Sequence, residues 1–118
     1  MKYIKTIKDL FEKASEREDG TANINGRMSY YDGGQGELES KYRIAFTKDH
    51  VSLDHWGTEI IVIDTAKEQV KNWYGESNSD RDAINMLLYL LSMDNKYYAI
   101  YRPSSVGFKV VKVALASV

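Results

Sequence analysis

The stretch 56–91 holds the densest apolar positions of the chain, and they follow two different periods. Ile60–Ile63 is a continuous apolar run, which favours a central strand covered on both faces, or on one face plus its edge. Later apolar positions recur three and four residues apart, which predicts one face of a helix. These positions are Ile84, Leu87, Leu88 and Leu91, and Ala83, Met86 and Leu90 widen the face. We therefore expect the core of the fold in this stretch.

Polar residues in front of this helix give it a start signal. Ser79 is a suitable N-cap, and Asp82 three positions later forms a pair like a capping box. Asp80 also lies where the helix dipole favours negative charge. The sequence therefore predicts a helix that is capped at Ser79 and ends before Asp94.

Short strands are predicted in front of this helix. Residues 42–46 alternate between large apolar and polar or small side chains, which is typical of a half-buried strand. Apolar alternation or a continuous apolar run recurs, with tight connections, at 51–55, 60–63 and 70–74. Four short strands joined in this way predict an antiparallel meander.

The flanks of the chain give weaker signals. A narrow apolar stripe predicts a helix over Thr6–Arg17, with Thr6 as its N-cap and Gly20 as a stop signal. Asn25–Gly26 predicts a tight turn, followed by a short strand over Met28–Tyr31. The glycine-rich segment Asp32–Gly36 is typical of a surface hairpin loop. At the other end, 97–101 and 108–113 are predicted to form a hairpin.

The order of these elements predicts one α+β domain over residues 1–118. Its antiparallel sheet would combine the meander with the C-terminal hairpin, and two helices would pack on it. The formal net charge is −1, which removes the simplest argument for a generic binder of nucleic acid or anionic membranes. The absence of cysteine excludes disulfides and thiolate zinc sites. Because no signal peptide or membrane span is predicted, we expect a cytoplasmic protein without a membrane partner.

Candidate chemistry is sparse, so we expect no enzyme, no cofactor and no metal. His50 and His55 would point to opposite faces of one strand, and no motif supplies further metal ligands. His55 is better explained as a packing or hydrogen-bonding residue at a strand end. The sequence contains no nucleophile elbow and no phosphate-binding loop. The alternative of a small-ligand-binding protein or an enzyme would place its site near Gly33–Gly36.

Aromatic residues are the more informative surplus, because the chain has nine tyrosines. Exposed tyrosines are favoured at interfaces, although tyrosine is also a good strand residue whose hydroxyl lies at the solvent boundary. The Trp73–Ser77 corner is a further candidate contact. The residues predicted to contact a partner are Tyr30, Tyr31, Trp73, Glu76, Tyr97, Tyr101, Arg102, Lys109 and Lys112.

The segments Leu53–Ile60 and Trp73–Asn85 resemble a pattern in small proteins of bacteriophages and mobile elements of Gram-positive bacteria. The resemblance covers the middle third of the chain, and no catalytic residue is attached to its motif. It implies a non-enzymatic inhibitor of a host protein, such as an anti-CRISPR or another counter-defence protein that acts on a defence nuclease.

Two hypotheses of binding follow, and they use different surfaces. The first is a module that binds and inhibits a host protein, plausibly a CRISPR-Cas or other defence nuclease. The second is a nucleic-acid-binding accessory protein, in which alternating lysines and tyrosines of the final hairpin contact the ligand. Association with a second copy of the chain remains open in both hypotheses.

Overall fold

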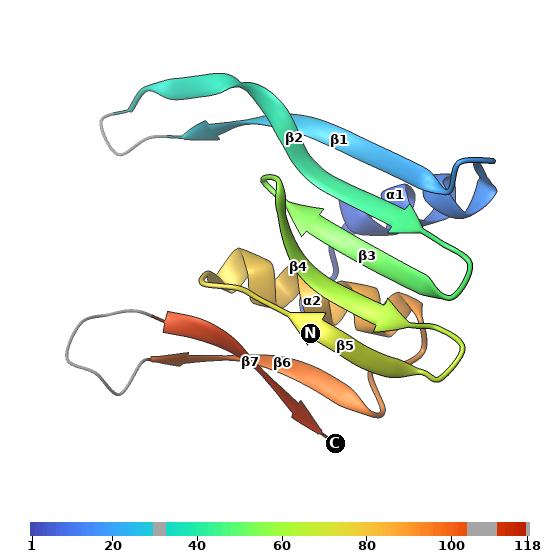
Figure 1. Cartoon of the computed structure of the whole chain (residues 1–118). Coiled ribbons are helices and arrows are strands. Elements are labelled where there is room, and N and C mark those ends of the chain that lie inside the picture. The colour runs from blue at the N-terminus through green and yellow to red at the C-terminus, as the bar shows by residue number, and fades with distance from the viewer. Residues whose placement is uncertain (30–32, 104–110, 118) are drawn as a thin grey trace.

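The structure, a computed structural model, describes residues 1–29, 33–103 and 111–117, and the side chains of residues 101–103, 111 and 112 lie outside this description. It is an α+β fold with a five-stranded antiparallel sheet, two helices and a two-stranded sheet (Figure 1). The elements are α1 (Lys5–Glu16), β1 (Thr21–Ser29), β2 (Gln35–Phe46), β3 (His50–His55), β4 (Thr58–Asp64), β5 (Gln69–Trp73), α2 (Asn78–Leu90), β6 (Tyr97–Pro103) and β7 (Val111–Ser117).

The predicted meander is confirmed, and it has five strands in sequence order. Both helices lie on the same face of this sheet (Figure 1). Alternate residues of β3, Val51, Leu53 and His55, are buried toward the helices, and Ile61 and Ile63 of β4 pair with the first two. The core therefore lies between the sheet and α2, as the apolar stretch predicted.

The fifth strand comes from the region where the sequence signals were weakest. Asn25–Gly26 lies inside β1 and pairs with Ser40 and Glu39, so the predicted tight turn is wrong. A bulge between Ile24 and Asn25 accommodates the pair. The chain reverses after Ser29 instead, and β2 is correspondingly longer than the strand predicted from residues 42–46.

The first helix agrees with the prediction in length but not in its cap. Ile4 occupies the N-cap position without a side-chain hydrogen bond, and its carbonyl oxygen accepts from the backbone N–H groups of Ile7 and Lys8. Thr6 therefore lies in the first turn, so its prediction as the N-cap is wrong. Apolar contacts compensate, because Leu10 is buried and Phe11 packs edge-on against Phe46 of β2.

The second helix begins earlier than its sequence signals indicated. Ser77, rather than Ser79, is the N-cap, and its Oγ accepts a hydrogen bond from the backbone N–H of Asp80 at 3.0 Å. The predicted pairing of Ser79 with Asp82 is therefore wrong. A related arrangement occurs two residues earlier, where Asp80 at the third helical position accepts from the backbone N–H of Glu76, the residue before the cap.

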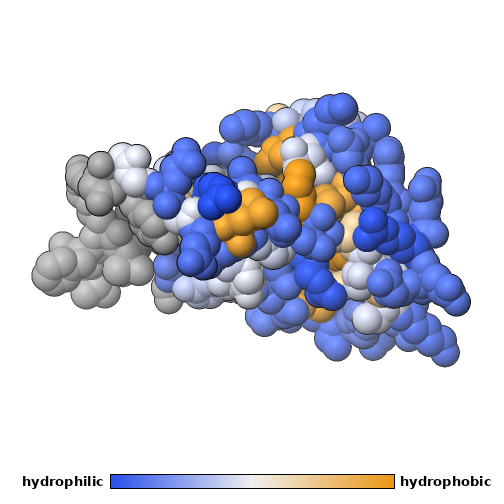
Figure 2. All heavy atoms as spheres, turned by 90° about the horizontal axis from the view of Figure 1, so that it is seen from above, coloured by the Kyte–Doolittle hydropathy of each residue, from blue (hydrophilic) through white to orange (hydrophobic). Residues whose placement is uncertain are grey.

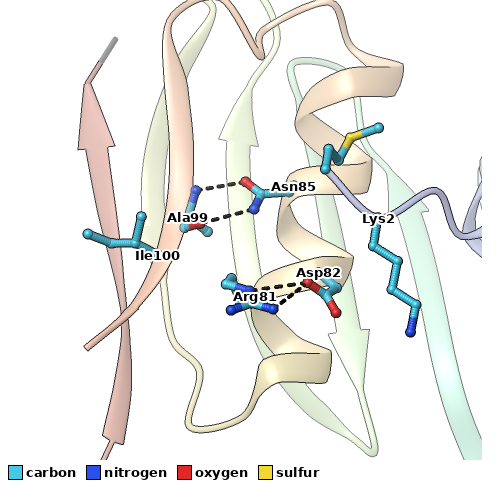
Figure 3. Close-up of a pocket in the computed structure, with 7 residues that line it drawn as sticks. Lys2, Arg81, Asp82, Asn85, Ala99 and Ile100 are labelled. Atoms are coloured by element: carbon cyan, nitrogen blue, oxygen red, sulfur yellow. Dashed lines mark hydrogen bonds and ion pairs between the residues drawn. The ribbon is translucent and has the colours of Figure 1, made fainter. Parts of the chain in front are cut away.

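The C-terminal hairpin is confirmed and forms a sheet of its own, with β7 placed later than the predicted segment 108–113. Two contacts attach it to the rest of the fold. The backbone N–H of Val113 donates to the carbonyl oxygen of Gly75 at 2.7 Å. The side-chain amide of Asn85 donates to the carbonyl oxygen of Ala99 at 3.0 Å and accepts from its N–H at 2.7 Å (Figure 3).

The surface seen from the side of α1 and β1 is mostly hydrophilic. Figure 2 shows its hydrophobic atoms in several separate groups. Among the described residues, no helix has the length and apolar character needed to cross a membrane. Large apolar side chains that remain exposed include Met28, Leu38, Trp73 and Tyr74.

Candidate functional site

An open pocket of about 440 Å³ lies where the N-terminus of α2 meets the sheet. The arm formed by β1, the turn between β3 and β4, and the connection from β5 to α2 all contribute to it. We call it the His55 pocket, and it is lined by Met28, His55, Trp56, Thr58, Ile60, Tyr74, Glu76, Ser77, Ser79 and Asp80.

A histidine and a carboxylate form its base. His55 ends β3 on the buried face of the sheet, and its side chain is 7% exposed. Its Nδ1 lies 2.6 Å from Oδ1 of Asp80. The second carboxylate oxygen of Asp80 accepts the backbone N–H of Glu76 at 3.0 Å. One carboxylate thus joins the end of the sheet to the first turn of α2.

The electrostatics of Asp80 fix the direction of this hydrogen bond. Burial opposes ionisation of the carboxyl group, but the hydrogen bonds from His55 and from the Glu76 N–H outweigh burial and lower the pKa of Asp80 below its ordinary 3.8. Asp80 is therefore an acceptor at neutral pH, and we assign the proton of the pair to Nδ1 of His55.

Aromatic rings hold the imidazole in place. The ring of Tyr42 stacks on it with centroids 4.5 Å apart and an interplanar angle of 8°. Trp56 lies beside it at 5.9 Å, and Lys41 stands over the rings of both Tyr42 and Trp56. This packing restricts His55 to one orientation. Burial also raises the pKa of the Tyr42 hydroxyl, with smaller contributions from the negative charges of Asp80 and Asp82.

Gly75, between the lining residues Tyr74 and Glu76, is in close contact with β7 and α2. A Cβ added at Gly75 would lie 2.5 Å from Cγ2 of Val113 and 2.9 Å from Cβ of Asp80. Glycine is therefore needed where the chain passes between β7 and α2. Tyr74 and Glu76 lie on either side of Gly75, and the Tyr74 hydroxyl donates a 2.5 Å hydrogen bond to Oε1 of Glu76. This bond raises the pKa of Tyr74.

The chemistry available to the pocket is hydrogen bonding and charge. Among the described residues, the only fully buried side-chain nitrogen or oxygen without a hydrogen-bond partner is Nε2 of His50. His55 also lines the pocket, and no hydrogen bond of its Nε2 occurs among the described residues. No group of three or more potential metal ligands occurs among the described residues.

A neighbouring pocket lies between α2 and β6 (Figure 3). Three of its polar side chains, Arg81, Asp82 and Asn85, already have hydrogen-bond partners. Arg81 donates two hydrogen bonds to Oδ1 of Asp82, and Asn85 is bonded to Ala99. The pocket therefore offers fewer free groups for a ligand than the His55 pocket.

Only some of the residues predicted to contact a partner lie at or next to the His55 pocket. Glu76 lines the His55 pocket, and Trp73, 42% exposed, immediately precedes Tyr74 of its wall. Tyr97 packs against the core instead. The Gly33–Gly36 loop contributes no residue to the His55 pocket.

The other predicted residues stay predictions. Tyr30, Tyr31 and Lys109 lie outside the described residues. Tyr101 and Arg102 pair in backbone register with Val113 and Lys112, but the side chains of Tyr101, Arg102 and Lys112 are not described. The nucleic-acid hypothesis rests on this set.

The pair at the base of the pocket was missed as a site. His55 was correctly interpreted as a hydrogen-bonding residue at a strand end, but its partner lies 25 positions later. Asp80 was attributed to helix capping alone. A signal was present, because a first-turn carboxylate and a strand-end histidine flank the same short strand pair, β4 and β5.

Comparison with protein-family models, curated proteins and solved structures finds no match for this chain. The site is therefore interpreted from its own geometry.

Proposed function

We propose that this protein is a non-catalytic module that binds a partner protein through the His55 pocket and its rim. The observation that carries the proposal is the exposure of large side chains around this pocket. Tyr74 is 45% exposed, Trp73 42% and Met28 37%. Binding energy at interfaces is concentrated in tryptophan and tyrosine side chains that fill pockets or border them.

The composition of the pocket supports binding more than catalysis. His55 and Asp80 form a hydrogen-bonded pair, but no described contact joins His55 to a serine or threonine hydroxyl that could act as a nucleophile. Ser77 is engaged as the helix cap. The pair instead fixes the end of β3 to α2, which gives the rim a rigid support.

The resemblance to phage and mobile-element proteins supplies the first class of partner to test. That class is a host protein in the bacterial cytoplasm, and within it a CRISPR-Cas or other defence nuclease. Inhibition of such a nuclease by stoichiometric amounts of the protein would identify the target.

A matched pair of tyrosines tests the proposal. Tyr74 and Tyr89 are each 45% exposed, but only Tyr74 lines the His55 pocket. A partner captured from a host lysate is identified, and its affinity for the purified protein is measured by calorimetry. We expect Tyr74→Ala to weaken binding by about tenfold or more, and Tyr89→Ala to change it less than about twofold.

Two outcomes would contradict the proposal. One is equal loss of affinity in both variants, and the other is loss in Tyr89→Ala alone. Thermal unfolding of both variants shows whether either change acts through the fold instead of the contact.

A further inference from the structure

The charged groups of the His55 pocket are unevenly distributed. Glu76 and Asp80 place two carboxylates in its lining, whereas no lysine or arginine lines it among the side chains that the structure describes. The carboxylate of Asp80 is already hydrogen-bonded to His55. The carboxylate of Glu76 accepts only the Tyr74 hydroxyl among its described contacts and is exposed.

Acceptors are available among the hydrogen-bonding groups, alongside the indole N–H of Trp56 and the hydroxyls of Thr58 and Ser79, which can donate. Because Nδ1 of His55 donates to Asp80, Nε2 presents a lone pair when the ring carries a single proton. The Tyr74 hydroxyl uses its proton on Glu76, so its oxygen remains an acceptor. A ligand that brings hydrogen-bond donors can therefore pair with these acceptors.

The apolar side chains of the pocket favour a ligand group that is flat or that has a long apolar chain. Trp56 and Tyr74 supply aromatic rings, and Met28 supplies a flexible thioether chain. Aromatic faces attract cations, and the effect is largest for tryptophan. The ammonium of Lys41 lies 6.0 Å from the centroid of the Trp56 ring, but Lys41 does not line the pocket.

We propose that the His55 pocket binds a positively charged side chain of the partner protein, with arginine preferred over lysine. This inference rests on the proposed function, because it names the group that the partner inserts. A guanidinium group carries five donors in a plane and can contact Glu76 while stacking on an aromatic ring. An ammonium group supplies the positive charge but has no plane that could stack on an aromatic ring.

The test uses the intact protein and small probes in place of the partner. Amide resonances are followed by NMR during titration with Nα-acetyl-arginine amide, Nα-acetyl-lysine amide and Nα-acetyl-glutamate amide, each to about 20 mM, which detects millimolar dissociation constants. We expect saturable shifts around residues 55–58 and 74–80 with the arginine probe, weaker shifts with lysine, and none with glutamate.

Charge variants provide the matched controls. Glu76→Gln keeps an acceptor for the Tyr74 hydroxyl but removes the charge, and we expect it to weaken arginine binding by about fivefold or more. Glu16→Gln makes the same change on the exposed face of α1 and should leave binding unchanged. Lys41→Gln removes the neighbouring positive charge and should strengthen binding.

Three results would overturn the inference: no arginine-dependent shift by about 20 mM, preference for the glutamate probe, or equal binding by Glu76→Gln and wild type. These failures can be told apart from failure of the proposed function. If Tyr74→Ala still abolishes binding of the identified partner, the face is correct and only the arginine anchor is wrong.

Discussion

The carboxylate of Asp80 connects three segments at the residue scale. It accepts from His55 at the end of β3 and from the backbone of Glu76, while its own N–H is bonded to the Ser77 cap. Each contact involves a charged or helix-terminal group, and such hydrogen bonds are stronger than neutral ones. Asp80 therefore supports the base of the pocket through hydrogen bonds to β3 and to the start of α2.

Stability in acid should report on this carboxylate. Because the pKa of Asp80 in the folded protein lies below its ordinary 3.8, ionised Asp80 stabilises the fold. This contribution is complete above the ordinary pKa and is lost as the pH falls through the lower folded pKa. We expect Asp80→Asn to be less stable than wild type at neutral pH, and the difference to shrink below about pH 4.

Urea unfolding at a series of pH values measures this difference. Asp9→Asn is a suitable control, because Asp9 is on the opposite helix and makes only a long surface ion pair with Lys5. A difference between Asp80→Asn and wild type that stays constant from neutral to strongly acidic pH would contradict the assignment.

At the scale of elements, one side chain hydrogen-bonds β6 to α2, in addition to the apolar packing of Ala99 against the core. Both backbone groups of Ala99 that hydrogen-bond to Asn85 point away from β7, so Asn85 acts like a neighbouring strand at the free edge of β6. Ala99 is 3% exposed, so water cannot easily replace these bonds. The hairpin is held by this amide and by the contact between Val113 and Gly75.

Replacing this amide should destabilise the hairpin. We expect Asn85→Ala to lower the free energy of unfolding by about 2–4 kcal/mol, because it leaves two buried backbone groups without partners. Asn72→Ala, at an exposed position of β5, should change it by less than about 0.5 kcal/mol. Chemical denaturation compares the two, and a similar small effect for both would show that the Asn85 contacts do not hold β6.

The elements differ in how well the sequence alone predicts them. The apolar runs of β4 and α2 placed the core correctly, because large aliphatic side chains occupy the buried positions of both elements. β1 was missed because Asn25–Gly26 has the composition of a turn but sits in a bulged strand, where Gly26 packs near Lys41 and Trp56. Tertiary contacts override the local preference at this position.

The candidate site was only partly predictable for a related reason. The Trp73–Ser77 corner could be proposed from exposed aromatic and acidic residues close together in the sequence. The pairing of His55 with Asp80 depends instead on where β3 ends relative to the first turn of α2. That position is set by the strand register and by the start of α2 at Asn78, which local signals placed two residues late.

At the scale of the whole molecule, the core that stabilises the fold and the surface proposed to contact a partner lie in different places. One face of the five-stranded sheet is covered by α1 and α2 (Figure 1), and the apolar core fills the space between them. The His55 pocket lies at one end of these layers, where the β1 arm, the turn containing Trp56 and the corner at Tyr74 meet. A partner at this end would contact three segments that are far apart in the sequence.

Hydrogen–deuterium exchange of the complex with the identified partner tests this account most directly. We predict that binding slows exchange in three separate segments, 26–29, 55–59 and 74–80, and leaves 87–98 unchanged. Protection confined to the C-terminal part of α2 and to β6, with none around the His55 pocket, would contradict the account.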